Sequence, residues 1–159
     1  MVQRNFPSVE SRRVGRPMPL YGRRKVSKQL TSWIPEDHAA APYVVYECYR
    51  RASIGQHPTL EEMPEILKAA MVRLRRGESP HCIYFMRLGN RVKIGTTRDL
   101  AKRVVSIQPE EVLAVRPGSF AMEHLIHAQF ADLRVSGEWF RLAEPLVGFI
   151  VELREGRCL

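Results

Sequence analysis

The sequence is poor in cysteine and contains no long hydrophobic run. Its three cysteines, Cys48, Cys82 and Cys158, cannot all pair within one chain, so a reducing compartment is expected. They also lack the paired spacing of a structural zinc site. No segment approaches the ~20 apolar residues that a membrane-spanning helix requires, and no apolar block follows Met1 as in a secretory signal. These absences predict a cytoplasmic protein without a membrane partner or a structural zinc ion.

Motifs for common cofactors are absent as well. The chain has neither a phosphate-binding P-loop nor the glycine fingerprint of a dinucleotide site, so no nucleotide cofactor is expected. The segment Glu123–His127 lacks the order of histidines and glutamate found in zinc proteases. The composition, 45% hydrophobic and 26% charged, is that of a folded protein with room for one packed domain and an appendage.

Acidic residues are scarce at the N-terminal end. The chain carries 25 lysines and arginines against 17 aspartates and glutamates, and residues 1–28 hold eight of the bases with Glu10 as their one acid. A concentrated cationic segment attracts polyphosphates by releasing condensed counterions, which favours DNA as a partner. A tail whose charges are merely solvated is the alternative. The candidate DNA-binding residues are Arg12, Arg13, Arg16, Arg23, Arg24 and Lys25.

The pattern along the chain divides it into three parts. Residues 1–28 lack an apolar period and predict a flexible basic arm, whereas residues 29–81 predict a helical accessory region. One helix is expected over Ala39–Arg51, and a second follows a capping box that begins at Thr59. The apolar stripe of the second helix favours packing onto neighbouring structure over a helix-turn-helix. Residues 82–159 predict a separate α/β domain.

Two strand-like runs, Cys82–Arg87 and Arg91–Thr96, are separated by a short glycine-containing turn and predict a β-hairpin. With a two-residue loop, Tyr84 faces Gly95 across the hairpin. Lys93 then lies diagonally beside Tyr84 on the same face. Because glycine has no side chain, space remains opposite the tyrosine.

Further elements complete the expected fold. A helix capped near Asp99 carries Arg103, a third strand covers Glu111–Arg116, and a final helix covers Ala143–Arg154. An intervening helix is expected to bury an apolar face made of Met122, Leu125, Ile126, Phe130 and Leu133. The predicted fold class is α/β, with a small, mainly antiparallel three-stranded sheet flanked by helices and preceded by the N-terminal helical accessory region.

The joint spacing of four motifs in the last half of the chain resembles the GIY-YIG endonuclease superfamily. These motifs are Cys82-Ile83-Tyr84, Lys93-Ile94-Gly95, Arg103 and Glu123. Glu123 with His127 four residues later, and Gly137-Glu138-Trp139-Phe140, are similar to the phage-type, T5-phage-like branch of that superfamily. A phage or mobile-element origin is compatible with this resemblance.

The resemblance implies hydrolysis of DNA phosphodiester bonds with one divalent metal ion, Mg²⁺ or Mn²⁺. It implies that Tyr84 is the general base, Glu123 the metal ligand and Arg103 the clamp for the scissile phosphate. A phenol has an ordinary pKa near ~10, so Tyr84 needs Lys93, Arg103 and the metal to favour its phenolate. His127 and Glu138 complete the expected catalytic set.

Several roles stay open at this point. His127 is interpreted as a phosphate contact, a proton carrier, a group that orients Tyr84 or a purely structural histidine. Glu138 either orients the catalytic groups or anchors the last helix. Because Lys93 stands where the superfamily has a second tyrosine, a catalytically silent DNA-binding module of the same fold is the alternative function. A protein-interaction domain is a third hypothesis, and a monomer is the default expectation.

Overall fold

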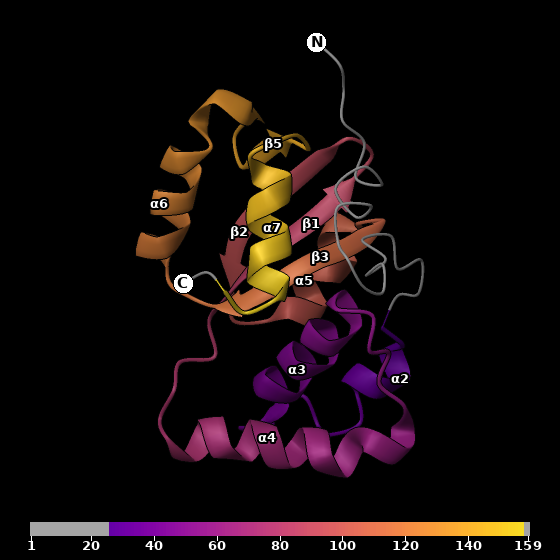
Figure 1. Ribbon diagram of the computed structural model, residues 1–159. Helices are drawn as coiled ribbons and strands as arrows, with labels where there is room; N and C mark the ends of the chain where they lie inside the picture. The colour runs from indigo at the N-terminus through magenta and orange to yellow at the C-terminus, as the bar shows by residue number, and fades with distance from the viewer. Residues whose placement is uncertain (1–25, 158–159) are drawn as a thin grey trace.

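The computed structural model describes residues 26–157, and its central feature is an antiparallel sheet of five strands in the order β3-β1-β2-β5-β4 (Figure 1). The strand bounds are Cys82–Leu88 for β1, Arg91–Thr97 for β2, Glu111–Pro117 for β3, Arg134–Ser136 for β4 and Trp139–Arg141 for β5. Helices flank this sheet, so the α/β class expected from the sequence is confirmed.

The helices begin at residues suited to helix starts. Pro42 occupies the first turn of α3, where its missing N–H costs nothing. Asp99 and Ser119 cap α5 and α6 by accepting hydrogen bonds from the backbone amides of Lys102 and Met122. The α-helices are α2 (Lys28–Thr31), α3 (Ala41–Ser53), α4 (Met63–Arg75), α5 (Leu100–Ile107), α6 (Phe120–Gln129) and α7 (Leu146–Arg154). Two 3₁₀ turns, η1 and η2, span Leu60–Glu62 and Ala131–Leu133.

Strands β1 and β2 form the hairpin that the sequence predicts. Tyr84 lies opposite Gly95 and Met86 lies opposite Lys93, in the expected register. Gly89 supplies a positive φ of 62° in the turn between the strands. Because side chains alternate across a strand, Tyr84 and Lys93 share one face of the sheet. The other face of the hairpin contributes Ile83, Phe85, Val92 and Ile94 to the hydrophobic core.

The sheet is wider than the three strands expected, because the chain after α6 folds back as a second hairpin. Strand β5 pairs with the start of β2, where Phe140 lies opposite Val92 and both side chains are fully buried. Gly137, with φ of 52°, lies in the turn between β4 and β5. Strands β4 and β5 have three residues each, too few for an alternating pattern to be recognised in the sequence.

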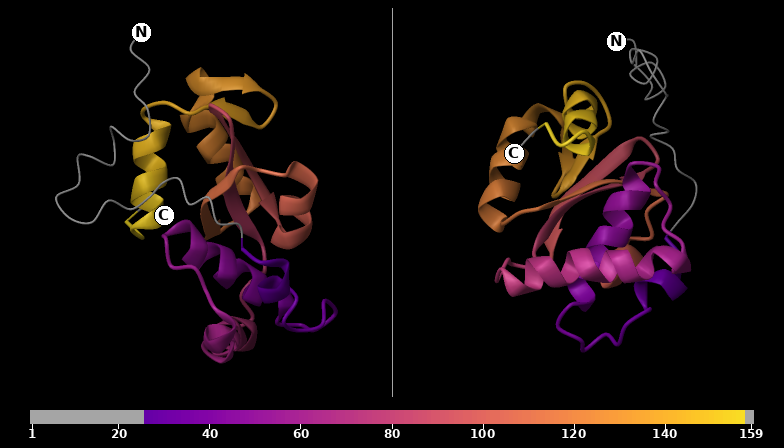
Figure 2. Two further views of the ribbon diagram at one scale, coloured as in Figure 1. Left: turned by 90° about the vertical axis from the view of Figure 1, so that its right-hand side faces the viewer. Right: turned by 60° about the horizontal axis from the view of Figure 1, so that its bottom comes forward.

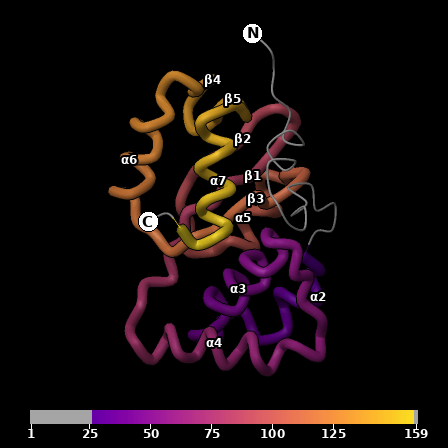
Figure 3. The backbone as a smooth tube through the Cα atoms, viewed as in Figure 1, coloured from indigo at the N-terminus to yellow at the C-terminus, as the bar shows by residue number. Residues whose placement is uncertain are grey.

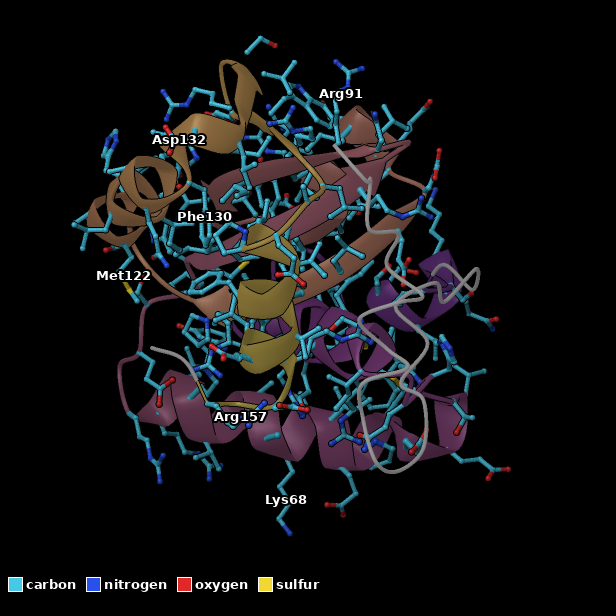
Figure 4. All side chains as sticks on the ribbon, turned by 45° about the horizontal axis from the view of Figure 1, so that its top comes forward. Lys68, Arg91, Met122, Phe130, Asp132 and Arg157 are labelled. Atoms are coloured by element: carbon cyan, nitrogen blue, oxygen red, sulfur yellow. The ribbon has the colours of Figure 1, made fainter. Side chains whose placement is uncertain are left out.

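Two layers of helices enclose the sheet. Helices α6 and α7 cover one face, and α3 and α5 lie against the other (Figure 2). Phe130 lies between α6 and α7 (Figure 4), where its ring centroid is 5.1 Å from that of Phe149. On the opposite face, Tyr46 of α3 and Leu100 of α5 pack in one cluster with Tyr84. The strand carrying Tyr84 is therefore buried on both sides.

Helix α3 connects the N-terminal helices to the sheet (Figure 3). One side of α3 places Tyr46 and Tyr49 in the cluster that includes sheet residues, and another side packs Val44 and Cys48 in a cluster with α4. The apolar stripe of α4 around Ile66 thus packs beside α3. Within residues 26–157, no helix is long and apolar enough to cross a membrane.

Helix α6 and the turn after it bury most of the apolar stripe that the sequence predicts, with Ile126, Phe130 and Leu133 in the core and Met122 packed against it. Leu125 was expected in the buried stripe, but 71% of it is exposed. Glu123 and His127 are buried instead, beside Ile126 and Phe130. The expectation for Leu125 was wrong because a hydrophobic pattern gives no signal for polar partners on the neighbouring strand. Those partners belong to the site described next.

Candidate active site

Tyr84 lies across the neighbouring strand. Its side chain projects from the middle of β1 on the face covered by α3 and α5, and only 1% of the residue is exposed. Gly95 of β2 lies directly beneath its ring, because a Cβ atom at position 95 would overlap the Tyr84 hydroxyl and ring. The glycine therefore lets the phenol extend over β2 toward the outer half of the sheet.

Three charged side chains act on the Tyr84 phenol. Burial is the largest effect and raises the pKa of Tyr84 to about 12. The positive charge of Arg103 lowers this pKa, whereas the negative charges of Glu138 and Glu123 raise it. The protein alone thus favours the neutral phenol. Among the expected site residues, Arg103, Glu123 and Glu138 are close enough to Tyr84 to influence its ionisation.

Glu123 is held by β2. The Thr96 hydroxyl donates a hydrogen bond of 2.7 Å to Glu123 Oε2, and both residues are buried. The other carboxylate oxygen, Oε1, lies 3.8 Å from Nε2 of His127. Thr96 was not singled out in the sequence. Its place two residues after Ile94, on the strand face that α6 covers, is the signal that could have identified it.

His127 binds the backbone of the same strand. Its Nε2 lies 2.9 Å from the carbonyl oxygen of Ile94, and its ring centroid lies 5.0 Å from that of Phe140. Since a carbonyl only accepts, Nε2 carries the hydrogen and donates it. The Ile94 amide in turn donates to the Glu138 carbonyl at 3.0 Å. His127 therefore fixes β2 beside Gly95, at the point where β5 no longer pairs with it.

Glu138 forms an ion pair with Lys93 instead of reaching the last helix. Lys93 Nζ lies 2.9 Å from Glu138 Oε2, and it also lies 5.4 Å from the centroid of the Trp139 ring. The carboxylate is 46% exposed, so it is accessible from solvent. The strand register places Lys93 beside Tyr84, and the ion pair with Glu138 largely balances the charge of Lys93.

Residues 26–157 contain no group of three or more acidic, histidine or cysteine side chains arranged to hold a metal. The donor set instead fits a hard ion bound by one carboxylate. Glu123 has an oxygen, Oε1, that makes no hydrogen bond to a described residue, and Mg²⁺ usually keeps several waters beside one or two carboxylates. His127 Nε2 is unsuited as a ligand because it already donates to Ile94.

The expected residues differ in where the structure places them. Tyr84, Lys93, Glu123, His127 and Glu138 gather around the outer part of β2. Arg103 is exposed on α5, one turn after its Asp99 cap. The candidate DNA-binding residues of the arm, Arg12, Arg13, Arg16, Arg23, Arg24 and Lys25, lie outside the residues that the structure describes.

A surface cavity of about 380 Å³ lies elsewhere, between the end of α4 and the start of α6. Arg73, His81 and Phe120 are among the residues that line it, whereas Tyr84 and Glu123 are not. The candidate catalytic residues thus gather around β2 and not at this cavity.

Comparison with known proteins gives one family match. Residues 81–155 match the T5orf172 domain, a domain found in phage and nuclease-like proteins. The match spans the whole sheet together with α5, α6 and α7, so it includes every expected catalytic residue. It agrees with the resemblance to phage-type domains and does not itself name the GIY-YIG superfamily. No curated protein and no solved structure matches the chain.

Proposed function

We propose that the chain is a metal-dependent DNA endonuclease of GIY-YIG type. The observation that carries the proposal is the convergence at β2: the Tyr84 phenol crosses Gly95, and the charges of Arg103, Glu123 and Glu138 act on that phenol. A base, a cation for phosphate and a carboxylate for a metal are the groups that phosphodiester hydrolysis requires. The nuclease-like nature of the matched domain supports the same conclusion.

In this proposal each side chain has one task. Tyr84 accepts the proton of the attacking water, and Arg103 donates its fork of N–H groups to the scissile phosphate. Glu123 would hold Mg²⁺ or Mn²⁺, which when bound neutralises charge on the leaving oxygen. Thr96 fixes the Glu123 carboxylate, and His127 acts as a positioning residue because its Nε2 is engaged with the backbone.

A catalytically silent DNA-binding module is the second candidate. One observation favours it: burial raises the pKa of Tyr84 to about 12, which opposes its use as a base near neutral pH. The two candidates differ in their dependence on metal. An enzyme loses turnover on chelation, whereas a binding module retains salt-sensitive affinity.

The test is cleavage of supercoiled plasmid and branched oligonucleotides with Mg²⁺, with Mn²⁺ and with EDTA. Tyr84→Phe removes only the hydroxyl, and we expect it to lower the rate at least ~100-fold, the usual contribution of general base catalysis. Glu123→Gln is expected to abolish the response to metal. Tyr49→Phe is the matched control, because Tyr49 is a buried tyrosine of the same cluster on α3.

The outcomes separate the candidates. Metal-dependent nicking that Tyr84→Phe abolishes and Tyr49→Phe preserves supports the endonuclease. Equal cleavage by wild type and Tyr84→Phe removes Tyr84 from the mechanism. If no substrate is cut while DNA is bound, the silent module is the better assignment.

A further inference from the structure

A second cationic feature lies on the same sheet face as Tyr84. Arg91 of β2 and Arg141 of β5 are directly opposite each other in the register, so their side chains leave the sheet on the same side. Both are exposed. Arg91 lies at the end of the molecule opposite Lys68 of α4 (Figure 4).

This arrangement places two positive charges opposite each other without an acidic partner among the described residues. Like charges directly opposite on neighbouring strands repel each other. Within residues 26–157, neither Arg91 nor Arg141 forms an ion pair with an acidic side chain. Lys93 lies on the same face, and the acidic partner beside this group is Glu138. Three cations and one anion leave this face with an excess of two positive charges.

Trp139 holds the cations in place. The guanidinium carbon of Arg91 lies 5.5 Å from the centroid of the Trp139 ring, and Lys93 Nζ lies 5.4 Å from it. Both are within the range of cation–π attraction. With two cations already against its ring, Trp139 is better suited to orienting charges than to stacking on a base. Trp139 therefore orders the charges of Arg91 and Lys93 on this face.

We propose that Arg91, which packs against Trp139, and Arg141, which lies opposite Arg91, form a phosphate-binding platform that contacts the DNA backbone beside the cleavage site. The inference rests on the proposed function for the identity of the polyanion as DNA. Gly95, beneath Tyr84, is four residues from Arg91 along β2, a span of roughly 13 Å at ~3.3 Å per residue. At ~3.4 Å of axial rise per nucleotide, a duplex whose axis follows β2 would have about four phosphates between the platform and the scissile bond.

The test measures affinity and its salt dependence in EDTA, so that cleavage does not interfere. The probe is a fluorescent DNA duplex of mixed sequence, bound by the full chain at several KCl concentrations. Two phosphate contacts change the slope of log K against log salt by about 1.8. We expect Arg91→Gln/Arg141→Gln to make this slope shallower by about that amount. Its affinity should fall on the order of tenfold or more at ~0.1 M salt, to a similar extent on unrelated sequences.

Two further variants complete the design. Arg75→Gln/Arg76→Gln removes the same charge from two exposed residues at the end of α4, far from β5 in the fold (Figure 1), and is expected to leave the slope near that of wild type. Arg91→Lys/Arg141→Lys keeps both charges and is expected to retain most of the slope. That result would show that the shallower slope of the glutamine variant comes from the lost charges at these positions and not from misfolding.

Each outcome decides the proposal. Equal slopes for the two glutamine double variants overturn it, because only total charge would then matter. Sequence-selective loss of affinity also overturns it, because backbone contacts carry no sequence information. If Arg91→Gln/Arg141→Gln lowers the slope relative to wild type as expected, but wild type cuts no substrate, the platform stands and the endonuclease proposal fails.

Discussion

Tyr84 lies in surroundings that oppose its ionisation. The sequence predicts its partner Gly95 and its diagonal neighbour Lys93, because a two-residue turn fixes the register of a hairpin. It does not predict the depth of burial, which comes from α3, a helix that starts about forty residues earlier in the chain. Nor does it predict that Lys93 is balanced by Glu138, since that contact depends on an unexpected strand.

The raised pKa of Tyr84 predicts a pH dependence for cleavage. The base form is the phenolate, so its fraction grows as pH rises and reaches half only near the folded pKa of about 12. We expect single-turnover cleavage to rise about tenfold per pH unit from neutral to weakly alkaline pH, with any plateau marking the pKa in the metal-bound complex. Rates measured across this range with saturating Mg²⁺ test it.

Tyr84→Phe is the control for that profile. Its residual rate should lack the tenfold rise, because the titrating hydroxyl is gone. A wild-type rate that is flat with pH would contradict the assignment of Tyr84 as base.

Helix α6 is docked by two polar contacts in addition to the hydrophobic stripe that was expected. Its sequence contains enough apolar residues for an apolar face, yet Leu125 is exposed while Glu123 and His127 face the sheet. Their partners are the Thr96 hydroxyl and the backbone carbonyl of Ile94. A backbone group is the same in every residue, so a sequence pattern cannot identify it as a partner. The helix and most of its buried stripe were therefore predictable from the sequence, whereas its two polar contacts were not.

The Thr96 contact predicts a stability effect. Thr96→Val keeps the shape and removes the donor, which leaves a buried carboxylate oxygen of Glu123 without its partner. We expect the free energy of unfolding to fall by about 1–3 kcal/mol. Urea denaturation of the metal-free protein measures it. Thr96→Ser retains the hydroxyl and should lose clearly less; equal losses in both variants would mean that the hydrogen bond contributes little.

At the scale of the whole molecule, the sheet is widened by the β4–β5 hairpin and covered on one face by the N-terminal helix α3. Three long strands and most helices were predictable from alternation, capping residues and glycine stops. The N-terminal helices also pack into the sheet, which brings Tyr46, Tyr49 and Cys82 into one cluster with Tyr84. Burial raises the pKa of each of these four groups to about 12.

This cluster predicts weaker folding in alkali. In the unfolded chain, Cys82 ionises near pH 9.0 and the tyrosines near 10.0, whereas in the folded protein they stay neutral to about 12. Deprotonation therefore stabilises the unfolded state first, and the stability present below pH 9 is lost as pH rises toward 12. Urea denaturation at a series of alkaline pH values should show this decline.

Tyr49→Phe isolates one contribution to that decline. A shift of two pKa units corresponds to at most about 2.7 kcal/mol, so the variant should lose less stability than wild type over the same interval. Identical losses would show that Tyr49 ionises as easily in the fold as outside it.

The way β2 ends its pairing with β5 bears on the behaviour of the protein at high concentration. Among the residues that the structure describes, β2 has no further partner strand on that side beyond Lys93, and such an edge is a template for pairing with another chain. The Glu138 carbonyl accepts the Ile94 amide and His127 donates to the Ile94 carbonyl, so two groups that a foreign strand would need are already taken. The His127 imidazole that fixes the candidate site is therefore also expected to oppose aggregation through this edge of β2.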